Sequence, residues 1–181
     1  MTAPVGTMPR FSKYTPAGAE NLNVIAREVE RQGRAVKASR STTFPIPDSI
    51  LTRTPLQTEN LDTAGGGGWD PLTPLFETVT VGGAWLFLGQ VRFSASATAT
   101  MTPQIVRGTF SPDNVMAAGP TVNSVSSGVG PTGQVWAFDY FAAGEQLSLA
   151  AYQNSGSAML ARVDFGGTFL AGVYLGGGSD S

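Results

Sequence analysis

The composition of this chain of 181 residues excludes several classes of protein. It has no cysteine and no histidine, which removes disulfides, zinc–thiolate sites and every catalytic site that depends on a histidine base. Charged residues make up 13% of the chain and the formal net charge is −2, so the totals give no indication of nucleic-acid binding. Glycine (23 residues) and proline (12 residues) are abundant instead, which favours short strands joined by turns over helices.

Residues 1–40 differ in charge from the rest of the chain. They hold seven Lys or Arg and three Asp or Glu, a balance of +4, whereas residues 41–181 hold four Lys or Arg and ten Asp or Glu, a balance of −6. A basic segment on an acidic body suggests an arm that docks on another molecule, with a solvated tail as the alternative. The segment lacks the charged-then-apolar order of a signal peptide, and the chain has no run of about 18 apolar residues that could insert into a membrane.

The spacing of apolar residues predicts one helix within this arm, over residues 16–38. Thr15 can cap the helix and Pro16 suits its first turn. The apolar stripe covers about two heptads, whereas a self-standing coiled coil usually needs three or four. We therefore expect the helix to dock on another protein, or to form a short bundle that a trimeric head holds together. The stripe that would anchor the arm consists of Leu22, Ile25, Val29 and Val36.

Residues 41–175 have the pattern of an all-β domain, and residues 176–181 are expected to be a flexible tail. Short apolar stretches alternate with turn residues throughout, which is typical of an antiparallel sandwich, jelly roll or barrel. A stretch rich in Gly, Ser and Pro over residues 115–132 predicts a long surface loop. The expected strands are 54–61, 76–81, 84–95, 102–110, 134–141, 146–153, 157–165 and 168–175.

Several of these strands are apolar on both faces. An antiparallel sandwich normally leaves one face of each sheet in water. Apolar residues on both faces therefore indicate that a second surface is covered, most simply by identical copies of the chain. The alternation predicts a core that includes Trp85, Phe87, Val91, Phe93, Trp136, Leu147, Leu149 and Ala151.

Three blocks of sequence in the β domain resemble the tumour-necrosis-factor (TNF) and complement-globular-head superfamily. In residues 76–87, FETVTVGGAWLF, a short strand leads through a glycine turn to an aromatic-rich strand, without the proline that the superfamily has before the glycine. Residues 143–156, AGEQLSLAAYQNSG, resemble a later turn and strand, with Glu145 in place of the usual Asp. Residues 168–175, TFLAGVYL, resemble the closing strand.

The resemblance implies an antiparallel, TNF-like jelly-roll sandwich that forms a tight homotrimer. The short N-terminal α-helix and the extended arm would precede this head. Within the trimer, the resemblance implies that two tyrosines line the axis, and the apolar residues on both faces imply that the second face of the strand over residues 84–95 is covered. The interface residues implied in this way are Tyr152, Tyr174, Leu86 and Leu88.

The superfamily is used in animals for receptor binding, and also in bacterial spore coats and in viral and phage appendages. The absence of cysteine, of a signal peptide and of a collagen-like stalk argues against the animal uses. We therefore expect a non-enzymatic bacteriophage virion protein, such as a minor tail or tail-tip protein, whose residues 1–40 attach it to other virion proteins. The head would stabilise the particle or contact a glycan or protein on the host surface. The alternatives are a capsid decoration or head-fibre protein, a tail-associated glycan depolymerase and a secreted lectin-like module.

No catalytic residue, cofactor or metal ion is expected. The carboxylate pairs Glu59 with Asp62 and Asp139 with Glu145 could act as acid and base in glycoside hydrolysis, but strand-end and turn positions explain them more simply. A calcium site would need a dense run of acidic ligands, which the chain lacks. Trp69 lies in a predicted loop, where it could stack on a sugar, and it is the expected ligand contact.

Overall fold

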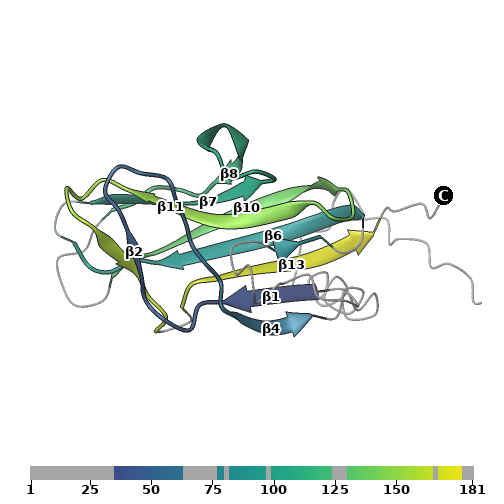
Figure 1. Ribbon diagram of the computed structural model, residues 1–181, viewed down its shortest axis with the longest axis horizontal. Coiled ribbons are helices and arrows are strands. Elements are labelled where there is room, and N and C mark those ends of the chain that lie inside the picture. Colours follow the sequence, from purple (N-terminus) through teal and green to yellow (C-terminus); the bar gives the residue numbers. More distant parts are fainter. Residues whose placement is uncertain are drawn as a thin grey trace, which may run out of the picture.

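Two antiparallel β-sheets packed against each other form the described part of the chain (Figure 1). The computed structural model describes residues 35–62, 77–79, 82–96, 99–123, 130–164 and 167–176. The elements are β1 (Ala35–Ser39), β2 (Phe44–Ile46), β3 (Thr52–Arg53), β4 (Thr58–Asp62), β5 (Glu77–Thr78), β6 (Gly83–Arg92), β7 (Thr100–Arg107), the short 3-10 helix η1 (Pro112–Asn114), β8 (Val115–Ala118), β9 (Val122–Asn123), β10 (Thr132–Phe141), β11 (Gln146–Gln153), β12 (Met159–Ala161) and β13 (Phe169–Gly176).

The strand order agrees with the jelly-roll class that the sequence predicts. The five-stranded sheet has the order β10-β6-β13-β1-β4, and Figure 1 shows β6, β13, β1 and β4 side by side. The second sheet has the order β3-β11-β7-β8, with β5 also paired to β11 and β9 to β7. Strands β2 and β12 form a separate pair. All pairs are antiparallel, and most join strands that are far apart in the sequence.

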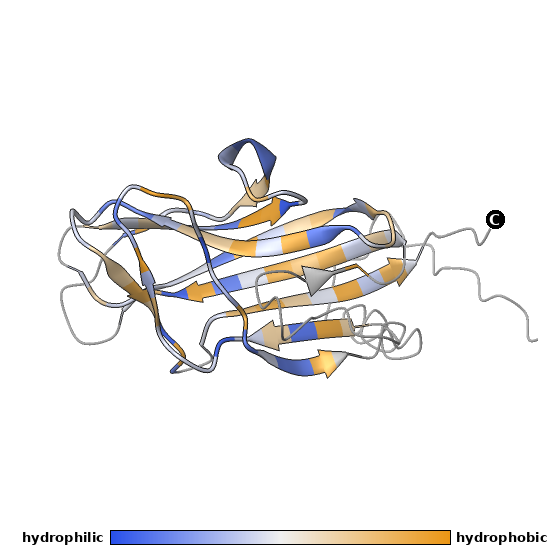
Figure 2. Cartoon of the chain, in the orientation of Figure 1, coloured by the Kyte–Doolittle hydropathy of each residue, from blue (hydrophilic) through white to orange (hydrophobic). Residues whose placement is uncertain are grey.

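The core lies between the two sheets and takes alternate residues from their strands. Figure 2 shows hydrophobic and hydrophilic residues following one another along the strands. The predicted core positions of β6 and β11, and of Phe93 just after β6, are confirmed, and each is at most 1% exposed: Trp85, Phe87, Val91, Phe93, Leu147, Leu149 and Ala151. Burying one large apolar side chain in this way stabilises a fold by roughly 1.5–3 kcal/mol, so this set dominates the stability of the domain.

A cluster of aromatic rings in the core explains why β13 carries a glycine. The ring of Phe87 stacks on Trp85 at 5.6 Å and meets Phe141 edge to face at 5.3 Å. Gly172 lies directly against it, because a Cβ atom built on Gly172 would come within 2.4 Å of Phe87 Cε1. Only a residue without a side chain leaves room for the phenylalanine ring between the sheets.

Residues 35–38, predicted as the end of the helix, are instead part of strand β1. This strand pairs with β13 on one side and with β4 on the other, and it buries Val36 and Ala38 while Lys37 is exposed. The helix prediction was therefore wrong here, because hydrogen bonds from two neighbouring strands outweigh the local helical pattern. Val36 belongs to the core and not to an anchoring stripe. Residues 16–34, with the other predicted anchoring positions Leu22, Ile25 and Val29, lie outside the described residues.

The predicted loop over residues 115–132 contains two short strands. Strand β8 pairs with β7 near Gln104 and Ile105, and β9 pairs with β7 at Thr100 and Met101. Neither short strand has a buried residue, so neither carries the alternation of buried and exposed positions that identifies a strand in a sequence. The predicted strand over residues 157–165 is also shorter than expected, since only β12 is regular.

Removing residues 1–40 should destabilise the domain far more than removing residues 1–34. The shorter deletion keeps all described residues, but the longer one takes away β1, which lies between β13 and β4 and buries Val36 and Ala38. We expect the longer deletion to lower the free energy of unfolding by at least about 2 kcal/mol, measured by urea denaturation followed by circular dichroism. Equal midpoints for the two variants would contradict the place of β1 in the sheet.

Candidate interaction face

One face of the five-stranded sheet points away from the core and carries large apolar side chains. Residues that are paired across the strands lie on the same side of a sheet, so the pairing register defines this surface. It contains two apolar rows, Trp136–Leu88–Ala171 and Phe138–Leu86–Val173. We call the surface made by these six residues and Tyr140 the aromatic face.

Three aromatic side chains of β10 are exposed to solvent on this face. The exposed fraction is 58% for Trp136, 67% for Phe138 and 55% for Tyr140. The prediction that Trp136 belongs to the core was therefore wrong. The core side of β10 is occupied by Val135 and Ala137, which are at most 4% exposed. Both rows of this strand are apolar, so packing against the other strands decides which row turns inward.

A hydrogen-bonded polar band lies at one end of the aromatic face. Gln134 Nε2 donates to Gln90 Oε1 at 3.0 Å, and Gln90 Nε2 donates to the backbone oxygen of Gly167 at 2.9 Å. These two glutamines are cross-strand neighbours in the row next to Trp136 and Leu88. The polar band covers β10 and β6, whereas the same row continues on β13 with Phe169.

Asp164, in the loop between β12 and β13, is the shared partner of two arginines. Arg92 Nε lies 3.2 Å from its Oδ1, and Arg162 Nη2 donates to its Oδ2 at 2.8 Å. Desolvation by burial acts to raise the pKa of Asp164, but the hydrogen bonds and charge of Arg162, a backbone hydrogen bond and the charge of Arg92 leave that pKa below its ordinary value. Because the Arg92 side chain is only 6% exposed, the pair fixes the loop against β6.

Arg107 forms an ionic clamp at the opposite end of β10. Its Nε donates to Glu145 Oε1 at 2.8 Å, its Nη2 to Glu145 Oε2 at 2.7 Å and its Nη1 to Asp139 Oδ2 at 3.0 Å. Its guanidinium also lies 4.7 Å from the centre of the Phe141 ring. The structure thus brings together the carboxylates of Asp139 and Glu145 that the sequence offered as a catalytic pair. One arginine binds both carboxylates, which suits a structural tie between β7, β10 and the following turn.

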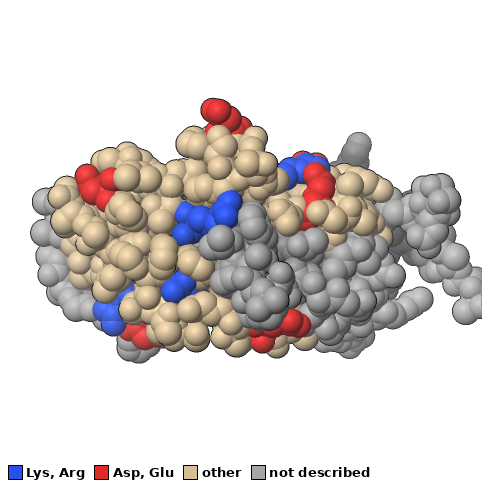
Figure 3. Space-filling model, in the orientation of Figure 1, with Lys and Arg blue, Asp and Glu red and all other residues tan. Residues whose placement is uncertain are grey.

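Charged residues form small, separate groups on the side of the molecule shown in Figure 3, and most of the described surface there is uncharged. Within the described ranges, no three acidic side chains gather in a way that could hold a metal ion. The same ranges contain no helix of sufficient length and apolar character to cross a membrane.

Two solved structures have a similar arrangement of strands. Eiger TNF from S. frugiperda has a TM-score of 0.56 and 12% sequence identity, over 81% of this chain and 95% of that one. Murine APRIL has a TM-score of 0.57 and 17% identity, over 78% of this chain and 98% of that one. The fold is the TNF-type jelly roll. The resemblance seen in the sequence is thereby confirmed at the level of fold.

Other comparisons add less. The globular domain of the zebrafish complement 1qA protein has a TM-score of 0.49 and 11% identity, over 81% of this chain and 99% of that one. No protein-family model matches the sequence, and no curated protein does. At these identities the comparisons establish the TNF-type fold alone.

The four predicted interface residues do not form one surface in this TNF-type fold. Leu86 and Leu88 lie on the aromatic face. Tyr174 turns the other way and packs edge to face on Trp85, with 5.5 Å between the ring centres. Tyr152 belongs to the second sheet. Alternation along a strand tells which residues share a side of that strand, but it does not tell which sheet the strand joins.

Sequence reasoning missed Phe138 and Tyr140 as surface aromatics. The signal that was available is the size pattern of β10, where large aromatic residues alternate with the smaller Val135 and Ala137. In β10 the core side of the sheet takes Val135 and Ala137 and leaves the larger row outside. Trp69, the expected ligand contact, lies outside the described residues.

The ion pair at Asp164 should make stability depend on pH in a defined direction. The folded protein holds the pKa of this carboxyl below its unfolded value, which is about 3.9, so its contribution is complete above that value and disappears as the pH falls through the folded pKa. We expect Asp164→Asn to lower the melting temperature at pH 7, and we expect the difference from wild type to vanish in strong acid. Differential scanning calorimetry between pH 7 and strong acid measures this difference in melting temperature.

Asp113→Asn, at an exposed aspartate of η1, is the matched control and should melt like wild type at pH 7. A wild-type advantage over Asp164→Asn that persists unchanged in strong acid would show that the aspartate acts through packing and not through its charge.

Proposed function

We propose that this protein is a non-enzymatic homotrimer that associates through the aromatic face and serves as a structural and binding component of a bacteriophage particle. The observation that carries the proposal is the exposure of Trp136, Phe138 and Tyr140 beside the leucines of β6. Monomeric soluble proteins rarely expose a continuous apolar patch of this kind, and such patches mark association surfaces. Aromatic residues in a desolvated interface also carry much of the binding energy.

The distribution of residue sizes on the aromatic face supports a cyclic assembly. The large aromatics stand on the edge strand β10, whereas the inner strand β13 presents the smaller Ala171 and Val173. In a ring, the β10 side chains of one copy would fill the shallower surface over β13 of the next, so one contact is repeated around the axis. The family resemblance implies three copies.

The position of β1 supports an attachment role for the segment that precedes it. Ala35, the first residue of β1, pairs with Val173, which belongs to the aromatic face. Three arms would therefore leave a trimer close to the surfaces where its subunits meet. Three copies of a basic arm, repeated around a symmetric particle, give strong avidity even when each contact is weak.

Light scattering on a sizing column tests the assembly. We expect wild-type protein to have three times the 18.8 kDa mass of one chain. Phe138→Ser and Trp136→Ser should each weaken association by about thirtyfold or more, because a central aromatic typically contributes at least about 2 kcal/mol. Ile50→Ser is the matched control, since Ile50 is 57% exposed but lies in the loop between β2 and β3. A monomeric wild-type protein, or dissociation by the control alone, would overturn the trimer.

Binding to phage particles tests the virion role separately. Particles assembled from a genome that lacks this gene should bind the recombinant full-length protein, as measured by co-sedimentation. The variant without residues 1–34 should remain trimeric but fail to co-sediment. Equal binding of both proteins would contradict the attachment role of the arm, and binding of neither would contradict the virion assignment.

A further inference from the structure

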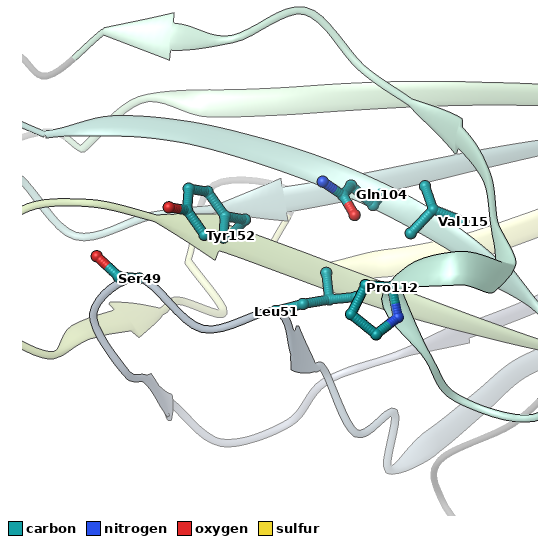
Figure 4. Close-up of a pocket in the computed structure, with 6 residues that line it drawn as sticks. All are labelled: Ser49, Leu51, Gln104, Pro112, Val115 and Tyr152. Carbon is teal, nitrogen blue, oxygen red and sulfur yellow. The ribbon is translucent and has the colours of Figure 1, made fainter.

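A shallow hollow of about 410 Å³ lies on the outer side of the second sheet, away from the aromatic face (Figure 4). Its size falls at the lower end of the range of small-molecule sites. Two segments provide its walls, one with Ser49 and Leu51 and the other with Pro112 and Val115, and Tyr152 and Gln104 of the sheet complete the lining. In Figure 4, Leu51 and Pro112 are drawn next to each other, Tyr152 lies near Ser49 and Gln104 lies near Val115.

Both walls of the hollow are fastened to the rest of the domain. The guanidinium of Arg53, in β3, lies 4.5 Å from the centre of the Phe110 ring, just before η1, and ties the two walls together. On the other side, Asp48 Oδ1 accepts from the backbone N–H of Gly156 at 2.7 Å. These contacts hold the hollow in place without a ligand, which lowers the entropy cost of binding one.

Ser49 is held at the rim in an unfavourable backbone conformation. Its φ is 56°, in the left-handed region that most residues avoid. Its N–H donates to the backbone oxygen of Gln153 at 2.7 Å and its hydroxyl donates to Asp48 Oδ2 at 3.0 Å. The hydroxyl oxygen of Ser49 still has lone pairs that can accept a hydrogen bond from a ligand.

Two polar groups in the hollow have no hydrogen-bond partner among the described residues. Within the described part of the chain, no hydrogen bond engages the side-chain amide of Gln104 or the hydroxyl of Tyr152. The amide offers both a donor and an acceptor, and the tyrosine offers a hydroxyl together with an apolar ring. The described residues that line the hollow include no charged side chain.

The geometry points to a binding site for a neutral saccharide in this hollow. The C–H face of a sugar ring would rest on the ring of Tyr152, and its hydroxyls would pair with the Gln104 amide and the Ser49 hydroxyl. Leu51, Pro112 and Val115 would cover the apolar edges. The hollow is too shallow and open to enclose an apolar chain, and its polar groups would be left unpaired by one. The site is complete within one chain, so it goes beyond the proposed trimer and does not depend on it.

An array of neutral oligosaccharides, with sialylated and sulfated glycans as charged comparators, tests the site. We expect full-length protein to bind neutral glycans, and we expect Tyr152→Ala and Gln104→Leu each to weaken the best hit by at least about tenfold in calorimetric titration. Tyr152→Phe, which keeps the ring, should bind better than Tyr152→Ala. Adding the hit to labelled protein should shift the side-chain amide resonances of Gln104.

Gln146→Leu is the matched control, because this exposed glutamine lies on the same side of the same strand as Tyr152 but outside the hollow. It should leave affinity unchanged. Binding of none of the neutral glycans, a preference for the charged comparators, or affinity that survives both Tyr152→Ala and Gln104→Leu in folded protein would overturn the site. The mass of the protein is measured independently of glycan binding. Failure to bind glycans would therefore leave the trimer proposal intact, and a monomeric protein would leave the saccharide-site proposal intact.

Discussion

The apolar character of both faces of β6 is the constraint on which the rest of the structure depends. This strand lies second in the five-stranded sheet, between β10 and β13. On one side its Trp85 and Phe87 are 1% exposed and meet the second sheet. On the other side its Leu86 and Leu88 face away from the core. A single chain folded into two layers can bury only the first of these sides. The second side therefore becomes a surface that favours association.

Side-chain size decides what each face of the five-stranded sheet can do. The core side must let the second sheet approach, and Gly89 and Gly172 lie where a Cβ atom would collide with Leu149 or with Phe87. The opposite side has no such limit, and the largest residues of β10 stand there. The glycines thus let the core rings of Trp85, Phe87 and Phe141 pack between the sheets, while the exposed aromatics of β10 stand on the opposite side.

The two sheets provide surfaces of different kinds. The aromatic face is broad and apolar, with the polar pair Gln90–Gln134 at one end. The ionic clamp of Arg107 lies on the other side of β10, because Asp139 pairs with the core residue Trp85. Its ion pairs are partly exposed and each contributes little to stability, so their main effect is to fix the turn after β10. The second sheet instead carries two fastened loops, and the hollow between them has the polar and aromatic groups that suit a small neutral ligand.

The sequence by itself determined the fold class and much of the core. Turn residues at regular spacing, together with alternation in β6 and β11, depend only on near neighbours along the chain, and these features predicted the all-β jelly roll correctly. The order of the glycine turns and aromatic strands also predicted the TNF-type resemblance.

Only the tertiary structure decided which strands are neighbours and which apolar row turns inward. In β10 both rows are apolar, so the sequence shows that two rows alternate but not which row faces the core. The core prediction for Trp136 was wrong for this reason. Strand β1 exists because Ala35 to Ser39 meet Phe169 to Val173, a pairing over more than half of the chain that no local pattern records. For the same reason Tyr152 and Tyr174, which were both predicted to line the trimer axis, lie on different sheets. Such outcomes depend on contacts between distant segments, which exist only once the chain has folded.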